Sequence, residues 1–540
     1  MRKNVKKQLA LRVLSTAALV AMVSSIATAA FADTYDLNTG SVTVETKEDG
    51  ITYVTQKDDK HVDGFARNKN NEILNEHPDD TGVTITSDGR QTSNTITVET
   101  AKDQTTDVTL EDVFINREGA RNSDSEAALT VKGDGDTNIE LNGNNTLSST
   151  GAHAGLEKTD AECSGTLTIT DDKNDDDGSD KKKDEYGYST GGDTGTLAVI
   201  GGGQGGASIG GQGTNKYWDS STDPGAPNIH STSNITITGG SICAGKTPTG
   251  CDSDYHWATG AGIGSGNADY SIKAGNGTDI TITGNADVVA TGGRHSAGIG
   301  GGYNGNGSDI IISGNAKVVA SGSVSGGAGI GGGDYGTGSV FITDNADVTA
   351  YGGNQGAGIG GGLYRGGSVE ISGNAKVTAV GANGSAGIGS GDSYGSSDLD
   401  TNVTISENAN VTAVGSYGSA AIGTGYRHKN GKTTINITGG TVTAISGKNA
   451  ITYDGEEVLP SAIGGGSTGR AQDVTVTING TTGNTTINAS CSGNVESAIS
   501  KGNGTTDIIG YDEDGKSPFG EDGSVIVRMY NHGSYTMGHG

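Results

Sequence analysis

The residues most able to bind a ligand in this sequence are aromatic side chains in polar segments. Tyr217 stands next to Trp218, and Tyr255 lies two positions before Trp257, which is the second and last tryptophan of the chain. Aromatic faces stack on the apolar faces of sugar rings, and an exposed indole in a hydrated loop is costly without such a use. These four side chains therefore predict a carbohydrate contact. The alternative is that they pack beneath their own loops as small satellite clusters.

A second series of tyrosines recurs once per sequence repeat. Each follows the isoleucine of a Gly-Ile-Gly or Ala-Ile-Gly motif by four to six residues: Tyr303, Tyr335, Tyr364, Tyr394 and Tyr426. If each repeat is one coil of a stack with a spacing of about 4.8 Å, the rings form a stripe whose period is close to that of an extended sugar chain. A carbohydrate platform is one interpretation. An aromatic stack that shields a glycine-rich corner is the other.

An acidic run offers the hard oxygen ligands that calcium prefers. The candidate ligands are Asp171, Asp172, Asn174 and Asp176. The last three match the first three ligand positions of an EF-hand loop, but Asp177 replaces the required glycine and Lys183 the required glutamate, which excludes that motif. A looser calcium loop stays open, and so does a solvated segment of mixed charge.

The four cysteines allow three pairings. Cys243 and Cys251 flank one polar segment, so we expect a disulfide that closes it. Cys163 and Cys491 are separated by roughly ten coils at about 4.8 Å each, whereas a disulfide needs Cα atoms within about 7 Å. We therefore expect these two to be buried free thiols.

The segment that must position these residues is a sequence repeat. Its isoleucines Ile299, Ile330, Ile359 and Ile388 are 31, 29 and 29 residues apart. Each unit contains three short stretches in which apolar and polar residues alternate, each ending in Gly or Asn, such as Ile280-Thr-Ile282. A propeller blade would need four strands and about 40 residues. The sequence therefore predicts an all-β fold, a right-handed single-stranded parallel β-helix with three short strands per coil of about 29 residues.

The turn between the first two strands of each unit has its own signature. An asparagine recurs there, as Asn285, Asn315, Asn345, Asn374 and Asn408. Asn is tolerated in the left-handed backbone region, so we expect positive φ at these asparagines. Stacked amides should also form hydrogen bonds from coil to coil.

The ends of the chain differ from the repeat. A basic start followed by a short apolar run and Ala30-Phe-Ala32 predicts a secretory signal peptide. The expected organisation is a signal peptide over 1–32, an N-terminal cap and irregular first coils over 33–105, a β-helix over 106–510 with inserted loops at 171–193, 214–232 and 245–258, and a C-terminal cap or linker over 511–540.

Net charge narrows the range of partners. The full chain has 35 basic and 63 acidic residues and a formal charge of −28. Loss of the leader removes five basic residues and makes the charge −33. Such a chain is not expected to bind nucleic acid or to insert into a membrane after signal cleavage. We expect a secreted monomer, with association to the cell surface as a variant.

The segment from Ala128 to Lys158, followed by GTLTITDD and GGASIGGQG, resembles a family of secreted bacterial carbohydrate-binding β-helix proteins of clostridial type. The resemblance covers roughly residues 105–215. It implies a pectate-lyase-like helix without lyase activity that binds acidic, pectin-type polysaccharide with the help of Ca²⁺. No calcium ligand can be transferred from it residue by residue.

Three classes of function remain open. The first is a non-catalytic polysaccharide-binding protein. The second is a polysaccharide lyase or hydrolase, which would need an Arg or Lys base beside calcium carboxylates, or two carboxylates about 5–9.5 Å apart. Arg294, Arg365 and Arg427 are scattered over loops and form no such centre with any carboxylate pair in the sequence. The third is a passive cell-surface adhesin or scaffold, since fold alone does not determine function.

Overall fold

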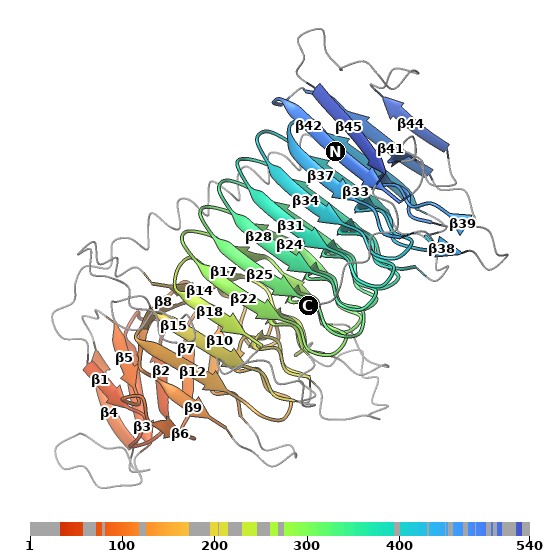
Figure 1. The fold of residues 1–540 in the computed structure, drawn as a ribbon. Helices are drawn as coiled ribbons and strands as arrows, with labels where there is room; N and C mark the ends of the chain where they lie inside the picture. Colours follow the sequence, from red (N-terminus) through yellow and green to blue (C-terminus); the bar gives the residue numbers. More distant parts are fainter. Residues whose placement is uncertain are drawn as a thin grey trace.

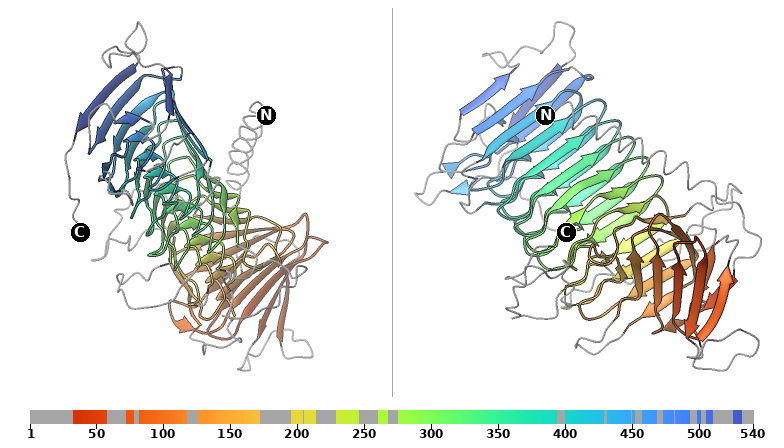
Figure 2. Two further views of the ribbon diagram at one scale, coloured as in Figure 1. Left: turned by 90° about the vertical axis from the view of Figure 1, so that its right-hand side faces the viewer. Right: turned by 180° about the vertical axis from the view of Figure 1, so that it is seen from behind.

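The computed structural model describes most of the chain between Asp33 and Asn531 (Figures 1 and 2). The described residues are 33–57, 72–77, 82–117, 126–171, 195–203, 205–213, 229–245, 260–267, 275–393, 400–428, 431–448, 450–451, 457–467, 473–480, 482–492, 498–500, 505–509 and 525–531. All regular secondary structure in these ranges is β, and none of it is a helix that could cross a membrane. The predicted leader and most of the three predicted insertions lie outside these ranges.

The strands form three long sheets that run side by side along one axis, here named A, B and C (Figure 1). Sheet A contains β1 (Asp33–Asp36), β5 (Val83–Thr86), β8 (Thr105–Glu111), β11 (Asp136–Asn142), β14 (Leu167–Thr170), β17 (Ile235–Ile237), β21 (Ile280–Ile282), β24 (Gly307–Ile312), β27 (Gly338–Ile342), β30 (Gly367–Ile371), β33 (Thr401–Ile405), β36 (Lys432–Ile437), β41 (Asp473–Ile478) and β44 (Thr505–Ile509), with β20 (Gly277–Thr278) beside β24.

Sheet B contains β4 (Glu72–His77), β3 (Thr52–Lys57), β2 (Val42–Thr46), β7 (Ile96–Thr100), β10 (Leu129–Gly133), β13 (Leu156–Glu157), β16 (Ile209–Gly210), β19 (Ile263–Gly264), β23 (Ile299–Gly300), β26 (Ile330–Gly331), β29 (Ile359–Gly360), β32 (Ile388–Gly389), β35 (Ile422–Gly423), β40 (Ile463–Gly464) and β43 (Ile499–Ser500). Its first parallel strands are five residues long, whereas those from β13 onward have two. This change in strand length divides the helix into two parts.

Sheet C contains β6 (Gln91–Thr92), β9 (Phe114–Asn116), β12 (Asn144–Ser148), β15 (Thr196–Ile200), β18 (Ser241–Ala244), β22 (Asp287–Thr291), β25 (Lys317–Ser321), β28 (Asp347–Tyr351), β31 (Lys376–Val380), β34 (Asn410–Val414), β37 (Gly440–Ile445), β42 (Thr485–Cys491) and β45 (Val525–Asn531). A separate pair joins β38 (Ala450–Ile451) to β39 (Glu457–Val458). Consecutive strands visit sheets A, C and B in turn, and neighbours within each sheet are parallel except at β2–β3–β4. The predicted parallel β-helix is confirmed.

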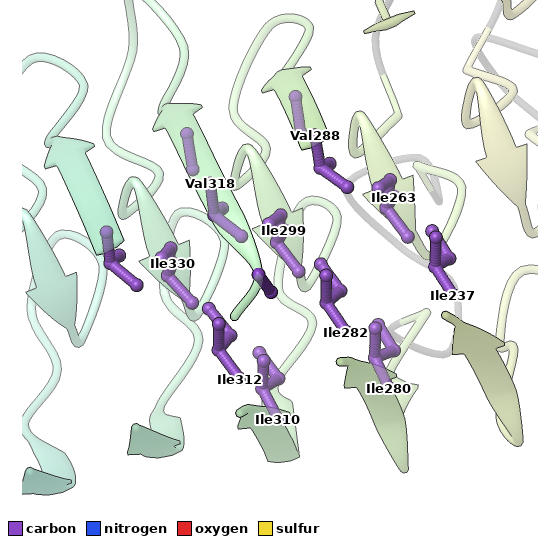
Figure 3. Close-up of a cluster of buried hydrophobic side chains, with 14 of the residues drawn as sticks. Ile237, Ile263, Ile280, Ile282, Val288, Ile299, Ile310, Ile312, Val318 and Ile330 are labelled. Atoms are coloured by element: carbon purple, nitrogen blue, oxygen red, sulfur yellow. The ribbon is translucent and has the colours of Figure 1, made fainter. Parts of the chain in front are cut away.

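The core is a set of aliphatic ladders inside the three sheets (Figure 3). Ile299, Ile330, Ile359 and Ile388 pair in register on sheet B and each is 0% exposed, which confirms the predicted ladder. Side chains alternate along a strand, so every second residue points inward and stacks on its equivalent in the next coil. Burying each isoleucine contributes about 1.5–3 kcal/mol.

Of the two predictions for the asparagine turn, the amide ladder is confirmed and the position of positive φ is wrong. The amides of Asn285, Asn315, Asn345, Asn374 and Asn408 form the expected ladder, with Nδ2–Oδ1 distances of 3.1 to 3.2 Å. Positive φ, however, occurs at the residue before each asparagine, for example Gly284 at 64° and Asp344 at 58°. The preceding residue makes the left-handed turn, which leaves each asparagine oriented along the stack.

A backbone hydrogen bond links the turns on either side of sheet B, and we call it the bridging hydrogen bond. The donor is the backbone amide of the residue four positions after the sheet B isoleucine of one coil. The acceptor is the backbone carbonyl of the residue four positions before the equivalent sheet B residue of the preceding coil. The pairs are Gly213–Ala152, Asn267–Gly205, Asp334–His295, Leu363–Gly326, Asp392–Gln355, Tyr426–Gly384 and Ser467–Gly418, at 2.6 to 3.1 Å. Since isoleucines fill the interior, these bonds pass over the outer face of the sheet.

Glycine is required where successive coils stack on one another in sheet B. Gly360 has φ 132°, and a Cβ on it would lie 2.1 Å from the carbonyl oxygen of Gly389. Gly300, Gly331 and Gly389 have equivalent surroundings. Only glycine adopts this backbone region without strain. The recurrent Gly-Ile-Gly motif is therefore a requirement of close backbone packing.

We predict that Gly360→Ala lowers the free energy of unfolding by about 3 kcal/mol or more. The new Cβ would clash with Gly389 O, and alanine would also be strained at this positive φ. Gly89→Ala is the matched control: Gly89 also has a positive φ, 66°, but a Cβ there meets nothing within 4 Å. It should cost only about 1–2 kcal/mol. Urea denaturation followed by circular dichroism measures both; equal losses would contradict the role given to close packing.

Candidate functional site

A groove lies on the outer face of sheet B, over the N-terminal coils that precede the first bridging hydrogen bond. Its volume is about 570 Å³. The residues that line it are Ser41, Val42, Thr43, Thr55, Thr95, Thr97, Glu126, Ala127, Thr130, Lys132, His153, Glu157, Glu162 and Gln212. They come from β3, β2, β7, β10 and β13 and from the turns around these strands.

The floor of the groove is one row of side chains in register across five neighbouring strands. The row consists of Thr55, Thr43, Thr97, Thr130 and Glu157. The alternate residues of these strands, such as Val42, Val44 and Val98, are buried in the core. Because the strands lie about 4.8 Å apart, the row presents four hydroxyls and one carboxylate over about 19 Å along the helix axis.

A second row runs beside the floor and is charged. Glu45, Glu99 and Lys132 are in register, and Lys132 Nζ lies 3.2 Å from Glu162 Oε2. The side chains of Lys132 and Glu162 are 40% and 48% exposed, so this ion pair adds little stability. Glu126 lies on the groove wall, 3.4 Å from Arg117. Carboxylates outnumber cations along the groove.

A half-buried histidine lies at the end of the row, hydrogen-bonded to a buried glutamate. His153 Nδ1 is 2.9 Å from Glu157 Oε2, and the backbone amide of Ala154 donates to the same oxygen at 3.0 Å. Gln212 Nε2 lies 3.4 Å from His153 Nε2. The Glu157 side chain is only 8% exposed. Burial acts to lower the pKa of His153, but the hydrogen bond and charge of Glu157 outweigh it, and the pKa is raised.

The next residue, Lys158, fixes this end of the strand from the inside. It is fully buried, and its Nζ donates to the carbonyls of Ser233 at 2.7 Å and Cys163 at 3.3 Å. Burial lowers the pKa of Lys158. Its side chain spans two coils below the floor, so Glu157 is held on a rigid base.

The groove ends where the bridging hydrogen bonds begin. Gly213 N donates to Ala152 O at 2.6 Å, and Gly202 N donates to His153 O at 2.9 Å. From β16 onward the described sheet B strands consist of Ile-Gly, except for Ile-Ser at β43. The open face of the sheet is thus confined to the first coils.

Of the predicted aromatic ligands, the structure describes four. Tyr217, Trp218, Tyr255, Trp257 and Tyr394 lie outside the described residues, and their sugar contacts stay predictions. The described members are Tyr303, Tyr335, Tyr364 and Tyr426, all of which lie in turns between sheets B and A.

The described tyrosines pack on one another. Tyr303 is 7% exposed and meets Tyr335 edge-to-face at 5.8 Å, and Tyr335 stacks on Tyr364 at 5.0 Å. Tyr426 meets Tyr417 edge-to-face at 5.6 Å. Since neighbouring rings contact these faces, the geometry favours a stack that shields the glycine-rich corner over a platform for sugars.

The candidate calcium ligands are mostly outside the described residues. Asp172, Asn174 and Asp176 are not described. Asp171 is described, and its Oδ2 accepts a hydrogen bond from Gly195 N at 3.1 Å, which closes the base of the insertion. Within the described ranges, no three His, Cys, Asp or Glu side chains are placed to hold a metal ion.

The structure describes three of the four cysteines. Cys163 and Cys491 are buried, as expected. Cys243 lies on β18 and is partly buried, while Cys251 is outside the described residues, so the predicted disulfide between them stays a prediction.

The groove is not predicted by the sequence. Thr43, Thr97 and Thr130 belong to ordinary alternating strands, and nothing in their spacing separates them from the many other outward threonines. One signal was present: in the first coils the Ile-Gly-Gly motif is replaced, as in Leu156-Glu157-Lys158. Loss of those glycines indicates a coil whose sheet B face is not bridged.

Comparisons of the chain with protein-family models, with curated proteins and with solved structures found no match. The candidate site therefore depends on the geometry described above.

We predict that His153 stabilises the fold in acid more than in alkali. Its folded pKa is raised above the ordinary value of 6.5, so its contribution is complete below that value and is lost as pH rises through the folded pKa. The parent protein should be more stable than His153→Gln in urea denaturation near and below pH 6.5, and this difference in the free energy of unfolding should fall as pH rises above 6.5 through the folded pKa.

His230 provides a control of opposite sign. Burial lowers its pKa, so its contribution is complete above the ordinary value and is lost as pH falls. The excess stability over His230→Gln should fall toward acid. The same pH dependence in both variants would contradict the assignment.

Proposed function

We propose that this protein is a secreted, non-catalytic polysaccharide-binding β-helix that holds a glycan chain in the sheet B groove. The observation that carries the proposal is the floor row, with four hydroxyls and a carboxylate in register on a rigid sheet. Their period of about 4.8 Å is close to that of an extended sugar chain. Hydroxyl and carboxylate groups in a fixed row suit the hydroxyls of a carbohydrate.

The charge of the groove separates two kinds of ligand. Glu126, Glu157 and Glu162 face Lys132 and His153, within a chain of net charge −28 before any processing. An uncharged polymer meets no repulsion there. The acidic, pectin-type polymer implied by the family resemblance would be repelled, and only partly screened over a Debye length of about 8 Å, unless Ca²⁺ bridged the two sets of carboxylates.

A polysaccharide lyase or hydrolase is the second candidate. The hydrogen-bonded His153–Glu157 pair in the groove supports it, because such pairs serve as general acids and bases. Against it, Glu157 already accepts hydrogen bonds from His153 and from the amide of Ala154, an arrangement that favours a fixed carboxylate over one that exchanges protons.

We predict that removal of floor hydroxyls weakens binding. On a glycan array and then by titration calorimetry, Thr97→Ala and Thr130→Ala should each lower affinity about 2- to 10-fold, as expected for one hydrogen bond. Thr349→Ala and Thr378→Ala are matched controls, since these threonines are equally half-buried on the outer face of sheet C. Equal effects of both pairs would contradict the groove as the site.

Addition of a chelator in the same assay separates the two ligand types. Binding of an acidic polymer should disappear with the chelator, whereas binding of a neutral polymer should persist. If the protein binds no glycan with or without calcium, the passive scaffold is the remaining function.

We predict further that the protein releases neither unsaturated uronide nor reducing sugar from the polymer it binds. Absorbance of the unsaturated product and a reducing-end assay measure this. Steady product formation that Glu157→Gln abolishes would instead establish the enzyme.

A further inference from the structure

We propose that the groove receives the end of a glycan chain and not its interior. This inference rests on the proposed function and adds the part of the polymer that is recognised. The floor row runs along the helix axis, so a chain lying on it points directly at the first bridged coil. The groove is closed at that end.

The closing wall is made of closely packed backbone. A Cβ on Gly202 would lie 2.4 Å from Gly151 O, one on Gly206 2.2 Å from His153 O, and one on Gly213 2.1 Å from the carbonyl carbon of Gly205. No side chain can rotate away to open such a wall. The bridging hydrogen bonds then recur along the following coils, at Asn267–Gly205 and at five further pairs.

The polar groups at the wall suit a chain end. The terminal sugar carries a hydroxyl that an internal sugar uses in its glycosidic bond. A carboxylate offers about four acceptor sites, and His153 and Ala154 N occupy part of those of Glu157. The side-chain amide of Gln212 lies beside them and can both donate and accept. Glu157 and Gln212 can therefore bind a terminal hydroxyl in a site that is largely shielded from water.

The remainder of the floor would hold the sugars that follow. Thr130, Thr97, Thr43 and Thr55 lie at increasing distance from the wall. Contacts should weaken toward Thr55, where the chain leaves the groove. The site then recognises a short terminal segment and lets the rest of the polymer extend away from the protein.

The test counts binding sites per chain. Homogalacturonan with calcium and a neutral (1→4)-linked glucan are each separated into short, medium and long fractions and titrated by calorimetry with the full mature protein. One protein should bind per chain at every length, and a short oligomer should match the affinity of the polymer. Several proteins per long chain, in proportion to length, would overturn end recognition and leave the proposed function intact. Binding to neither series would overturn both.

Variants give a second readout on the same chains. Glu157→Gln should lower affinity about 10- to 100-fold, as expected for a hydrogen bond to a charged group, while Thr55→Ala should lower it less than Thr130→Ala. Circular dichroism confirms that each variant is folded. Equal effects at Thr55 and Thr130, together with an unchanged affinity in Glu157→Gln, would contradict an end bound at the wall.

Discussion

The bridging hydrogen bond is the interaction on which the regular part of the helix depends. It brings two turns of successive coils together over the outer face of a strand only two residues long. In the turns, a Cβ on Gly391 or Gly425 would lie 2.7 or 2.8 Å from the acceptor carbonyl of this bond, Gln355 O or Gly384 O. Within sheet B, a Cβ on Gly300, Gly331, Gly360 or Gly389 would lie 2.0 to 2.1 Å from the carbonyl oxygen of the equivalent glycine in the next coil. The close stacking of the coils accounts for the glycines of the Gly-Ile-Gly motif, and the bridging hydrogen bond accounts for the covered outer face of sheet B wherever the described coils carry it.

The first coils show what happens without this bond. Their sheet B strands, such as β7 and β10, are five residues long, and a threonine and a charged residue occupy the outward positions of each. The same interior ladders continue below them, so the change concerns the outside of the helix alone. The outer face of sheet B is thus open in the first coils and bridged in the later ones, and the boundary lies at the hydrogen bond between Gly213 and Ala152.

Most of the fold could be predicted from the sequence because the residues that determine it recur at a fixed period. A repeat of 29 to 31 residues and alternating isoleucines require stacked coils, and the ladders of Ile330 and Asn345 follow directly. The position of positive φ could not be predicted, because Gly, Asp and Glu all occur there, as at Gly314, Asp344 and Glu407. The groove could not be predicted either, since it depends on which turns meet across a sheet. The bridging contact joins residues of different coils, and a missing glycine is the only sequence signal of a coil that lacks it.

The bridging hydrogen bond also has a consequence for how such chains can change. It always joins positions four residues before and four residues after the sheet B isoleucine. The described segment 205–213 has this length. The predicted insertion 214–232 begins immediately after it, and the predicted insertion 245–258 ends five residues before Ile263. Loops of any length can therefore be exchanged at these junctions, and whole coils gained or lost by recombination, without disturbing the register of the stack.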